Sequence, residues 1–185
     1  MILFALAVIF FLIAVNALYV AAEFATVTVR HSQVRQLADD GNSLAKGLLP
    51  VLLDTHSLDR YIAACQIGIT LSSLVLGAFG QATVAGDLTV LLQSVADMTP
   101  LTASSTSAVI VLVLLTTLQV VLGELVPKSL ALQFPTPVAL YTHLPMRWSL
   151  KLYSIFIIVL NGSGLLLLRF LGMGSQSAHR HVHSP

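Results

Sequence analysis

The segment YIAACQIGITLSSLVLGAFGQATVA, residues 61–85, contains no charged side chain. A helix needs about 20 predominantly apolar residues to cross a bilayer, so this segment is long enough to do so. Three further apolar stretches lie at residues 1–29, about 101–123 and 152–168. The first two of these are also long enough, whereas the last is shorter and is interrupted by NGSG at 161–164. The sequence therefore predicts an all-α integral membrane protein with three transmembrane helices.

The composition supports this class and excludes others. Of the 185 residues, 56% are hydrophobic and 9% are charged, whereas a soluble globular domain has about 25% charged residues. The abundance of Leu, Val and Ile is also incompatible with intrinsic disorder. The net charge is +1 and the nine Lys and Arg residues are scattered, which gives no basic patch for nucleic acid. The chain has no Ser/His pair, His-Glu-x-x-His motif or glycine-rich phosphate loop, so we expect that it is not an enzyme.

The positions of the basic residues predict the orientation, because Lys and Arg are enriched in cytoplasmic loops. The loop between the first two stretches carries four of them: Arg30, Arg35, Lys46 and Arg60. The loop before the third stretch carries Asp87 and Asp97 but no basic residue, so we expect it outside. Both flanks of the fourth stretch are basic, so this stretch is expected to dip into or lie along the inner leaflet rather than to cross. We predict a multi-pass protein with its N-terminus outside and its C-terminus in the cytoplasm.

Short helices are expected on the cytoplasmic side. The loop at 31–60 contains Gly41 and Pro50 and is predicted to hold two short helices around a turn. Between the third and fourth stretches, prolines forbid one continuous helix and favour short juxtamembrane helices and turns. These prolines are Pro135, Pro137 and Pro145.

Polar residues inside the apolar runs are candidates for function, because ionisable groups within a membrane are costly. Asn16 and Glu23 are seven residues apart and therefore share one face of the first helix. A polar stripe occupies one face of the second helix and consists of Gln66, Thr70, Ser73 and Gly77, with Gly68 and Ser72 beside it. Small and hydroxyl residues also serve helix packing alone, so the pattern itself leaves a packing role and a binding role open.

The third stretch ends in LGELVPKS, residues 122–129. Pro127 has no N–H, so the carbonyl of Gly123 loses its helical partner beside the carboxylate of Glu124. Mg²⁺ prefers about six oxygen ligands, and broken helices whose freed carbonyls meet an ion recur in transporters. The alternative is a proline kink in which Glu124 reaches the inner interface or pairs with Lys128 at i+4.

Three segments, NALYVAAEFA at 16–25, CQIGITL at 65–71 and LGELVPKS at 122–129, together resemble the transmembrane domain of the CNNM/CorC family. The likeness is greatest to the bacterial haemolysin-like CorC branch and covers essentially the whole chain. It implies a transmembrane domain at 1–172 and, at 173–185, a cytoplasmic linker toward a CBS-domain region that this chain lacks. That linker contains His179, His181 and His183.

The resemblance also implies an assembly and an activity. It implies a homodimer in the bacterial inner (plasma) membrane, with a belt-like juxtamembrane region and with cytosolic CBS domains in the full-length chain. The transported ion would be Mg²⁺, exported from the cytoplasm, with Na⁺ as the counter-ion. The family's glutamate falls on Glu124, and its hydroxyl from the second span falls on Ser73 or Thr70.

Residues and resemblance together give a specific hypothesis. The metal site is expected to consist of Glu124, Gly123, Asn16, Thr70, Ser72 and Ser73. Residues around that site, or linked to Na⁺, are expected to be Glu23, Gln66, Gly68, Pro127 and Lys128. Two alternatives stay open: an exporter of organic cations such as polyamines, and a non-transporting membrane anchor that senses divalent ions.

Overall fold

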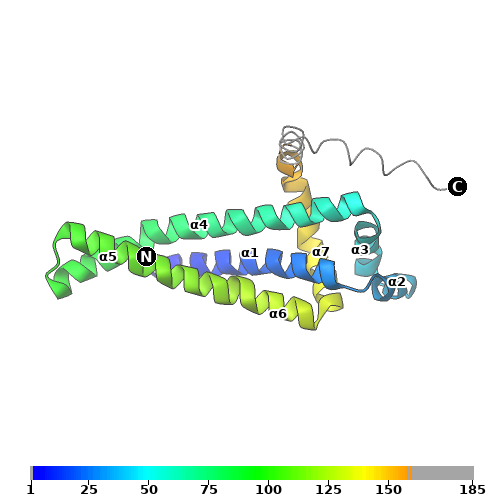
Figure 1. Ribbon diagram of the computed structural model, residues 1–185, viewed down its shortest axis with the longest axis horizontal. Coiled ribbons are helices and arrows are strands. Elements are labelled where there is room, and N and C mark those ends of the chain that lie inside the picture. Colours follow the sequence, from blue (N-terminus) through cyan, green and yellow to red (C-terminus); the bar gives the residue numbers. More distant parts are fainter. Residues whose placement is uncertain (1, 158, 160–185) are drawn as a thin grey trace, which may run out of the picture.

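Three long apolar helical paths lie alongside one another in the computed structural model (Figure 1). The structure describes residues 2–157 and 159. The first path is α1 (Ile2–Thr28) and the second is α4 (Thr55–Ala96). The third consists of α5 (Pro100–Leu118), the π-helix η1 (Gln119–Leu125) and α6 (Val126–Gln133).

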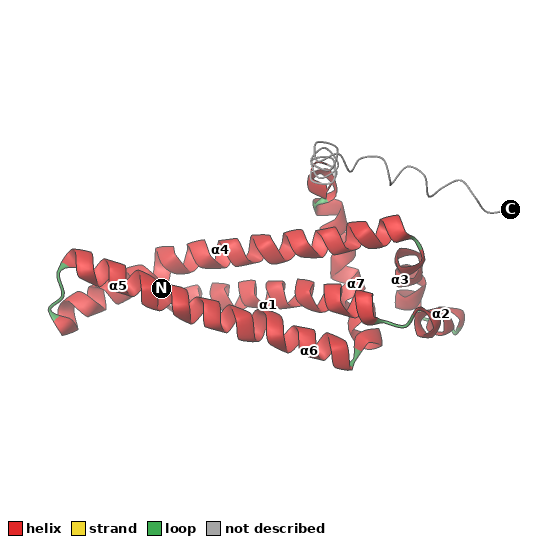
Figure 2. Ribbon diagram, in the orientation of Figure 1, coloured by secondary structure: helices red, strands yellow, loops and turns green. Residues whose placement is uncertain are grey.

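The predicted class is confirmed. In the described part of the chain, the regular structure is entirely helical and the loops between helices are short (Figure 2). Three helical segments are long and apolar enough to cross a membrane, namely Leu3–Thr28, Thr55–Ala96 and Pro100–Gln133. The chain is therefore an integral membrane domain with three spans.

Helix α4 is longer than its charge-free segment predicted. It begins at Thr55 rather than Tyr61, because the Asp54 carboxylate accepts hydrogen bonds from the Ser57 backbone N–H at 3.0 Å and from its hydroxyl at 2.6 Å. It continues to Ala96, where Asp97 takes a left-handed conformation with φ 49° and ends the helix. A helix of 42 residues is about 63 Å long, roughly twice the hydrocarbon thickness of a bilayer. The α4–α5 hairpin accordingly extends past the N-terminal end of α1 (Figure 1).

The two short helices expected in the loop after α1 are present as α2 (His31–Asp39) and α3 (Ser43–Leu53). Gly41, with φ 96°, makes the turn between them, a conformation that a residue with a side chain rarely adopts. Asn42 then caps α3, since its side-chain oxygen accepts from the backbone N–H groups of Leu44 and Ala45 at 2.9 and 3.1 Å.

The segment that contains Pro135, Pro137 and Pro145 is more continuously helical than predicted. A break does occur at Phe134, between α6 and α7 (Pro135–Leu152). Pro135 fits the first turn of α7, where no N–H donor is needed. Pro145, however, lies inside α7 without ending it, so the prediction that it breaks the helix is wrong. Packing explains this, because His143 and Met146 on either side of Pro145 are both buried against the bundle.

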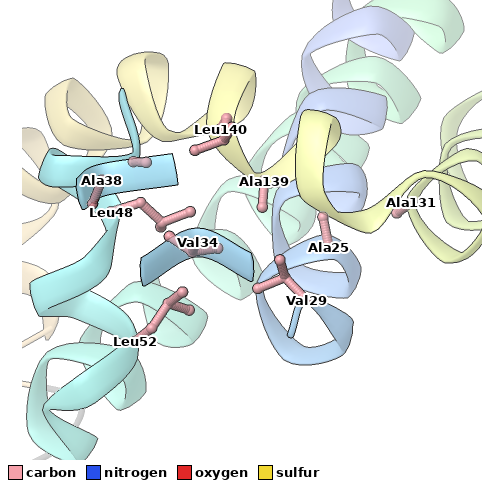
Figure 3. Packing of buried hydrophobic residues seen from close by; sticks show 10 residues of the cluster. Ala25, Val29, Val34, Ala38, Leu48, Leu52, Ala131, Ala139 and Leu140 are labelled. Atoms are coloured by element: carbon pink, nitrogen blue, oxygen red, sulfur yellow. The ribbon is translucent and has the colours of Figure 1, made fainter. Parts of the chain in front are cut away.

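Helix α7 crosses the three paths at the end where α2 and α3 lie (Figure 1). A cluster of small and branched apolar side chains joins α1, α2, α3, α6 and α7 at this end (Figure 3). We call it the basal cluster; its buried members include Ala25, Val29, Val34, Leu48, Leu52 and Ala139. The basal cluster ties α7 to the spans. Most of the fourth apolar stretch and the linker at 173–185 lie outside the described residues.

Candidate cation site

A cluster of buried polar groups lies where α1, α4 and η1 meet. Asn16 of α1 is completely buried, and its amide nitrogen donates to the Gly123 carbonyl of η1 at 3.0 Å. Its side-chain oxygen accepts from the hydroxyls of Ser72 and Ser73 of α4 at 2.9 and 3.3 Å. Four of the six predicted metal-site residues (Asn16, Ser72, Ser73 and Gly123) thus lie in one network that joins all three spans.

The π-helix explains why the Gly123 carbonyl is free to join this network. Pro127, which is buried at the start of α6, cannot donate a backbone hydrogen bond. The chain widens in the turn before it, where the Val126 N–H bonds to the carbonyl of Val121, five residues earlier. Single π turns within α-helices are frequent at functional sites. The carbonyl that the sequence predicted to be free is therefore occupied by the Asn16 amide.

Glycine is required at 123 by the closeness of its neighbours. A Cβ atom at this position would lie 3.0 Å from the Asn16 amide nitrogen and 3.2 Å from the Gln119 side-chain oxygen. These separations are shorter than ordinary van der Waals contact. The absence of a side chain lets two polar groups from different helices approach the same stretch of backbone.

Gln119 is a member of the network that the sequence reasoning missed. Its amide nitrogen donates to the Ser73 hydroxyl at 3.0 Å. Its side-chain oxygen is buried and has no hydrogen-bond partner within the described residues. The signal for it was present, since Gln119 lies one helical turn before Gly123 at the end of an apolar run. A buried acceptor without a donor is costly, so this oxygen points to a missing partner.

Glu124 follows Gly123 in η1 and is half-buried. Its backbone therefore lies next to the Gly123 carbonyl that Asn16 binds. Lys128, which the alternative interpretation paired with Glu124, places its ammonium 4.4 Å from the centre of the Phe24 ring of α1. That cation–π contact holds α6 against α1.

Two further predicted residues of α4, Gln66 and Thr70, lie outside the Asn16 network. Gln66 donates to the Glu23 carboxylate across 3.4 Å, which links a second acidic group to α4. Thr70 is exposed, and together with Gln66 it lines a largely apolar groove of about 820 Å³ between α4 and the segment 152–157. The predicted polar stripe is thus divided: Ser73 joins the Asn16 network, whereas Gln66 and Thr70 face the groove.

The face of α4 that packs against α1 is not the predicted polar stripe but the face next to it on the helix. It carries Gly68 and Ser72, both of which are buried. A Cβ at Gly68 would come within 2.5 Å of the Tyr19 ring, so the glycine allows the ring to lie directly on the α4 backbone. This contact sets the rotation of α4 and turns Ser72 toward Asn16.

The donor set can be compared with the needs of a cation. Within residues 2–157 and 159, no group of three or more His, Cys, Asp or Glu side chains could hold a metal ion. The network instead offers amide, hydroxyl and carbonyl oxygens, and Glu124 follows Gly123 directly in the chain. These are the hard oxygen ligands that Mg²⁺ and Ca²⁺ accept, whereas softer metals prefer sulfur or imidazole.

Fold and site together define a three-span membrane domain with a buried polar cluster at a broken third helix. The sequence model of the protein family described as the cyclin M transmembrane N-terminal domain (CNNM) matches residues 7–185. The chain belongs to this family.

Similar proteins of Bacillus subtilis and Synechocystis support this assignment. The UPF0053 protein YugS of Bacillus subtilis is 36% identical over 184 residues, which cover 100% of this chain and 42% of YugS. YhdT of the same organism is 38% identical over 173 residues, covering 94% of this chain and 37% of YhdT. The UPF0053 protein sll0260 of Synechocystis is 35% identical over 170 residues, covering 92% of this chain and 37% of that protein. The chain thus spans about two fifths of the length of these curated relatives.

Proposed function

We propose that this domain transports Mg²⁺ out of the cytoplasm through the network centred on Asn16. The observation that carries the proposal is the convergence of oxygens from all three spans. One of these oxygens, on the Gln119 side chain, is buried without a partner among the described residues. That oxygen is an acceptor open to a further ligand. A cation nearby would satisfy it.

The Asn16 side chain is the central element of the proposed site. Its oxygen accepts from two serine hydroxyls, and its nitrogen donates to the Gly123 carbonyl. An arriving cation takes over the Asn16 and Gly123 oxygens together with the Ser72 and Ser73 hydroxyls. The exchange of hydrogen bonds for ion–oxygen contacts loosens the direct link between α1 and η1. Such a change of partners gives the site two states.

Glu124 supplies the negative charge that a dication needs. The other oxygens of the network are neutral, and a bare dication among neutral dipoles in a membrane is poorly compensated. Glu124 follows Gly123 directly in η1 and is half-buried, and we expect its carboxylate to turn toward the ion when one binds. Thr70 lies on the groove side of α4 and joins the ion path rather than the central network.

Export against a negative-inside potential requires a driving ion. Moving two charges outward costs about 4.6 kcal/mol per 100 mV. Inward movement of Na⁺ supplies this free energy, and the Glu23–Gln66 pair is the second acidic site available to it. The proposed orientation has the N-terminus outside, with α2, α3 and α7 at the cytoplasmic end.

Features of the whole protein extend this proposal. The relatives are more than twice as long as the matched region, so a complete protein has room for cytosolic domains after α7. We infer that CBS domains occupy that region and regulate transport, and that the membrane domain works as a homodimer.

The decisive experiment compares Mg²⁺ binding and flux in two carboxylate variants. Glu124→Gln is expected to abolish Mg²⁺ binding measured by calorimetry, with an unchanged helical circular dichroism spectrum. The matched control is Asp87→Asn, an exposed carboxylate of α4 outside the network, which should bind Mg²⁺ as the parent does. Retained Mg²⁺ affinity in Glu124→Gln would overturn the assignment.

Flux in proteoliposomes separates the alternatives. Mg²⁺ movement that depends on an opposite Na⁺ gradient supports exchange. Competition by diamines rather than by Na⁺ indicates an organic-cation exporter. Mg²⁺ binding without any flux indicates an ion-sensing anchor.

A further inference from the structure

Helix α7 carries an exposed apolar face that points away from the bundle. Its residues recur every three or four positions, so they form one stripe along the helix. The stripe consists of Tyr141, Leu144, Trp148, Leu152 and, just past the helix, Ile155. Trp148 is 79% exposed and Tyr141 is 72% exposed. Large exposed apolar patches mark an interaction surface.

The opposite face of α7 shows at what depth the helix lies. Ser149 shares a hydrogen bond of 2.9 Å with the Tyr19 hydroxyl, and Met146 lies 3.9 Å from the Cys65 thiol. Tyr19 and Cys65 belong to α1 and α4, inside two segments that can cross the membrane. Helix α7 therefore lies level with the last turns of the spans. It crosses them (Figure 1), and because its buried residues pack against the spans, the exposed stripe lies on the side of the helix away from them.

Two cations border the stripe. Arg147 and Lys151 are both exposed, and their positions on the helix place them along one edge of the apolar face. No Asp or Glu occurs in α7. Long basic side chains beside an apolar face reach the headgroup region while their stems stay in contact with the acyl chains. Trp and Tyr also concentrate at this boundary.

We propose that α7 is an in-plane membrane helix that binds anionic phospholipid. The stripe rests in the boundary between headgroups and acyl chains of the leaflet at the α2–α3 end, and Arg147 and Lys151 bind the lipid phosphates. Through Leu152 the stripe continues into the apolar groove beside α4, which extends the lipid-facing surface. A helix with this arrangement of aromatic, aliphatic and basic residues has the pattern of an interfacial helix.

The charges favour lipid over a second copy of this chain. In a two-fold contact through the stripe, the same residues meet on both sides. Arg147 and Lys151 would then approach their own counterparts with no carboxylate on either α7 to pair with them. Like charges brought together in this way oppose association.

The single tryptophan of the chain makes the proposal directly testable. Because Trp148 is the only tryptophan, the intrinsic tryptophan fluorescence of the protein reports on α7 alone. The full chain is reconstituted in vesicles that contain brominated phospholipids, which quench fluorescence on contact. Bromine near the headgroup end of the acyl chains is expected to quench Trp148 several times more strongly than bromine near the terminal methyl groups. Brominated phosphatidylglycerol should also quench more than brominated phosphatidylcholine at the same mole fraction.

Variants test the role of the charges. The double variant Arg147→Gln/Lys151→Gln should keep the quenching by zwitterionic lipid and lose the preference for anionic lipid. The matched control is Arg35→Gln/Lys46→Gln, which removes two exposed cations from α2 and α3 and should keep the preference. Equal quenching by both lipids in the parent chain would overturn the proposal.

Two other results would also overturn it. Trp148 that is quenched by iodide in the aqueous phase but not by brominated lipid would show a face open to water. Trp148 that is shielded from both quenchers, and becomes quenchable by lipid when the protein is diluted in excess lipid, would show that a second copy covers the stripe.

Discussion

The Asn16 amide nitrogen and the Gly123 carbonyl oxygen are joined by a buried hydrogen bond of 3.0 Å, between residues 107 positions apart in the sequence. This bond connects the middle of α1 to η1, the segment of the third span that forms a π-helix rather than an α-helix. The same Asn16 side chain accepts from Ser72 and Ser73. One amide therefore joins three helices at the proposed cation site.

Asn16→Ala is expected to destabilise the domain. The substitution leaves the Gly123 carbonyl buried without its donor, which costs about 1–3 kcal/mol. Thermal unfolding in detergent micelles measures the loss. The matched control is Thr117→Ala, whose exposed hydroxyl bonds only within its own helix, to Val113, and which should unfold near the parent temperature. An Asn16→Ala protein as stable as the parent would mean that the network contributes no net stability.

Gly123→Ala is expected to disrupt the same network by crowding it. The new methyl group would stand 3.0 Å from Asn16 and 3.2 Å from Gln119, so at least one of these side chains must move away. We expect weaker Mg²⁺ binding by calorimetry, with the helical content retained. Gly86→Ala is the control, because nothing lies within 4 Å of a Cβ there and alanine favours a helix by up to about 1 kcal/mol. Equal Mg²⁺ affinity in both variants would contradict the proposed site.

Gly68→Ala is expected to separate α4 from α1. Its Cβ would lie 2.5 Å from the Tyr19 ring, and the ring is held by hydrogen bonds of its hydroxyl to Ser149 and Tyr153 at 2.9 and 3.3 Å. Overpacking of this kind costs about 1–3 kcal/mol. Gly77→Ala, on the same helix with open space around it, should be neutral.

A double-mutant cycle tests whether the Tyr19 ring is the cause. In a Tyr19→Ala background the ring is gone, so Gly68→Ala should add little further destabilisation. An unchanged cost in that background would show that another contact requires glycine at this position.

His143 is expected to make the stability of the domain depend on pH. Its side chain is buried in α7, and both ring nitrogens lack a hydrogen-bond partner within the described residues. Burial, with a smaller effect of Arg147, lowers the pKa of His143 from its ordinary value of 6.5. The unfolded chain therefore binds a proton that the folded chain does not, and the free energy of unfolding falls as the pH drops below about 6.5.

The measurement is the unfolding temperature between pH 7.5 and 5. His143→Leu should remove part of the decline below pH 6.5, whereas His31→Asn, at an exposed position, should leave it unchanged. An identical decline in the parent and in His143→Leu would assign the pH dependence to other groups.

The sequence alone predicted the number of spans and the break in the third one. Transfer of a segment into a bilayer depends on the summed hydrophobicity of consecutive residues, so a span can be read from its own residues. The loss of a backbone donor at Pro127 is equally local, and it correctly directed attention to the Gly123 carbonyl. The ends of α4 were less well predicted, because capping by Asp54 and the tolerance of charge outside the bilayer extend a helix past its apolar segment.

The contacts between spans were decided by the tertiary structure. Helical periodicity placed Gln66, Thr70 and Ser73 on one face, but it could not say how far that face is rotated from α1. The Tyr19 ring on Gly68 sets that rotation, brings Ser72 and Ser73 to Asn16, and leaves Thr70 at a groove. Gln119 joined the network for the same reason, since its importance depends on a neighbour 46 positions away.

The sequence by itself therefore determined which segments enter the membrane and where one helix is broken, because hydrophobicity and backbone hydrogen bonding act along the chain. Only the tertiary structure decided which polar groups meet, how Pro145 is accommodated and which face of α7 is left exposed. Those outcomes depend on the rotation of each helix about its axis, and close packing between helices distant in the sequence determines that rotation.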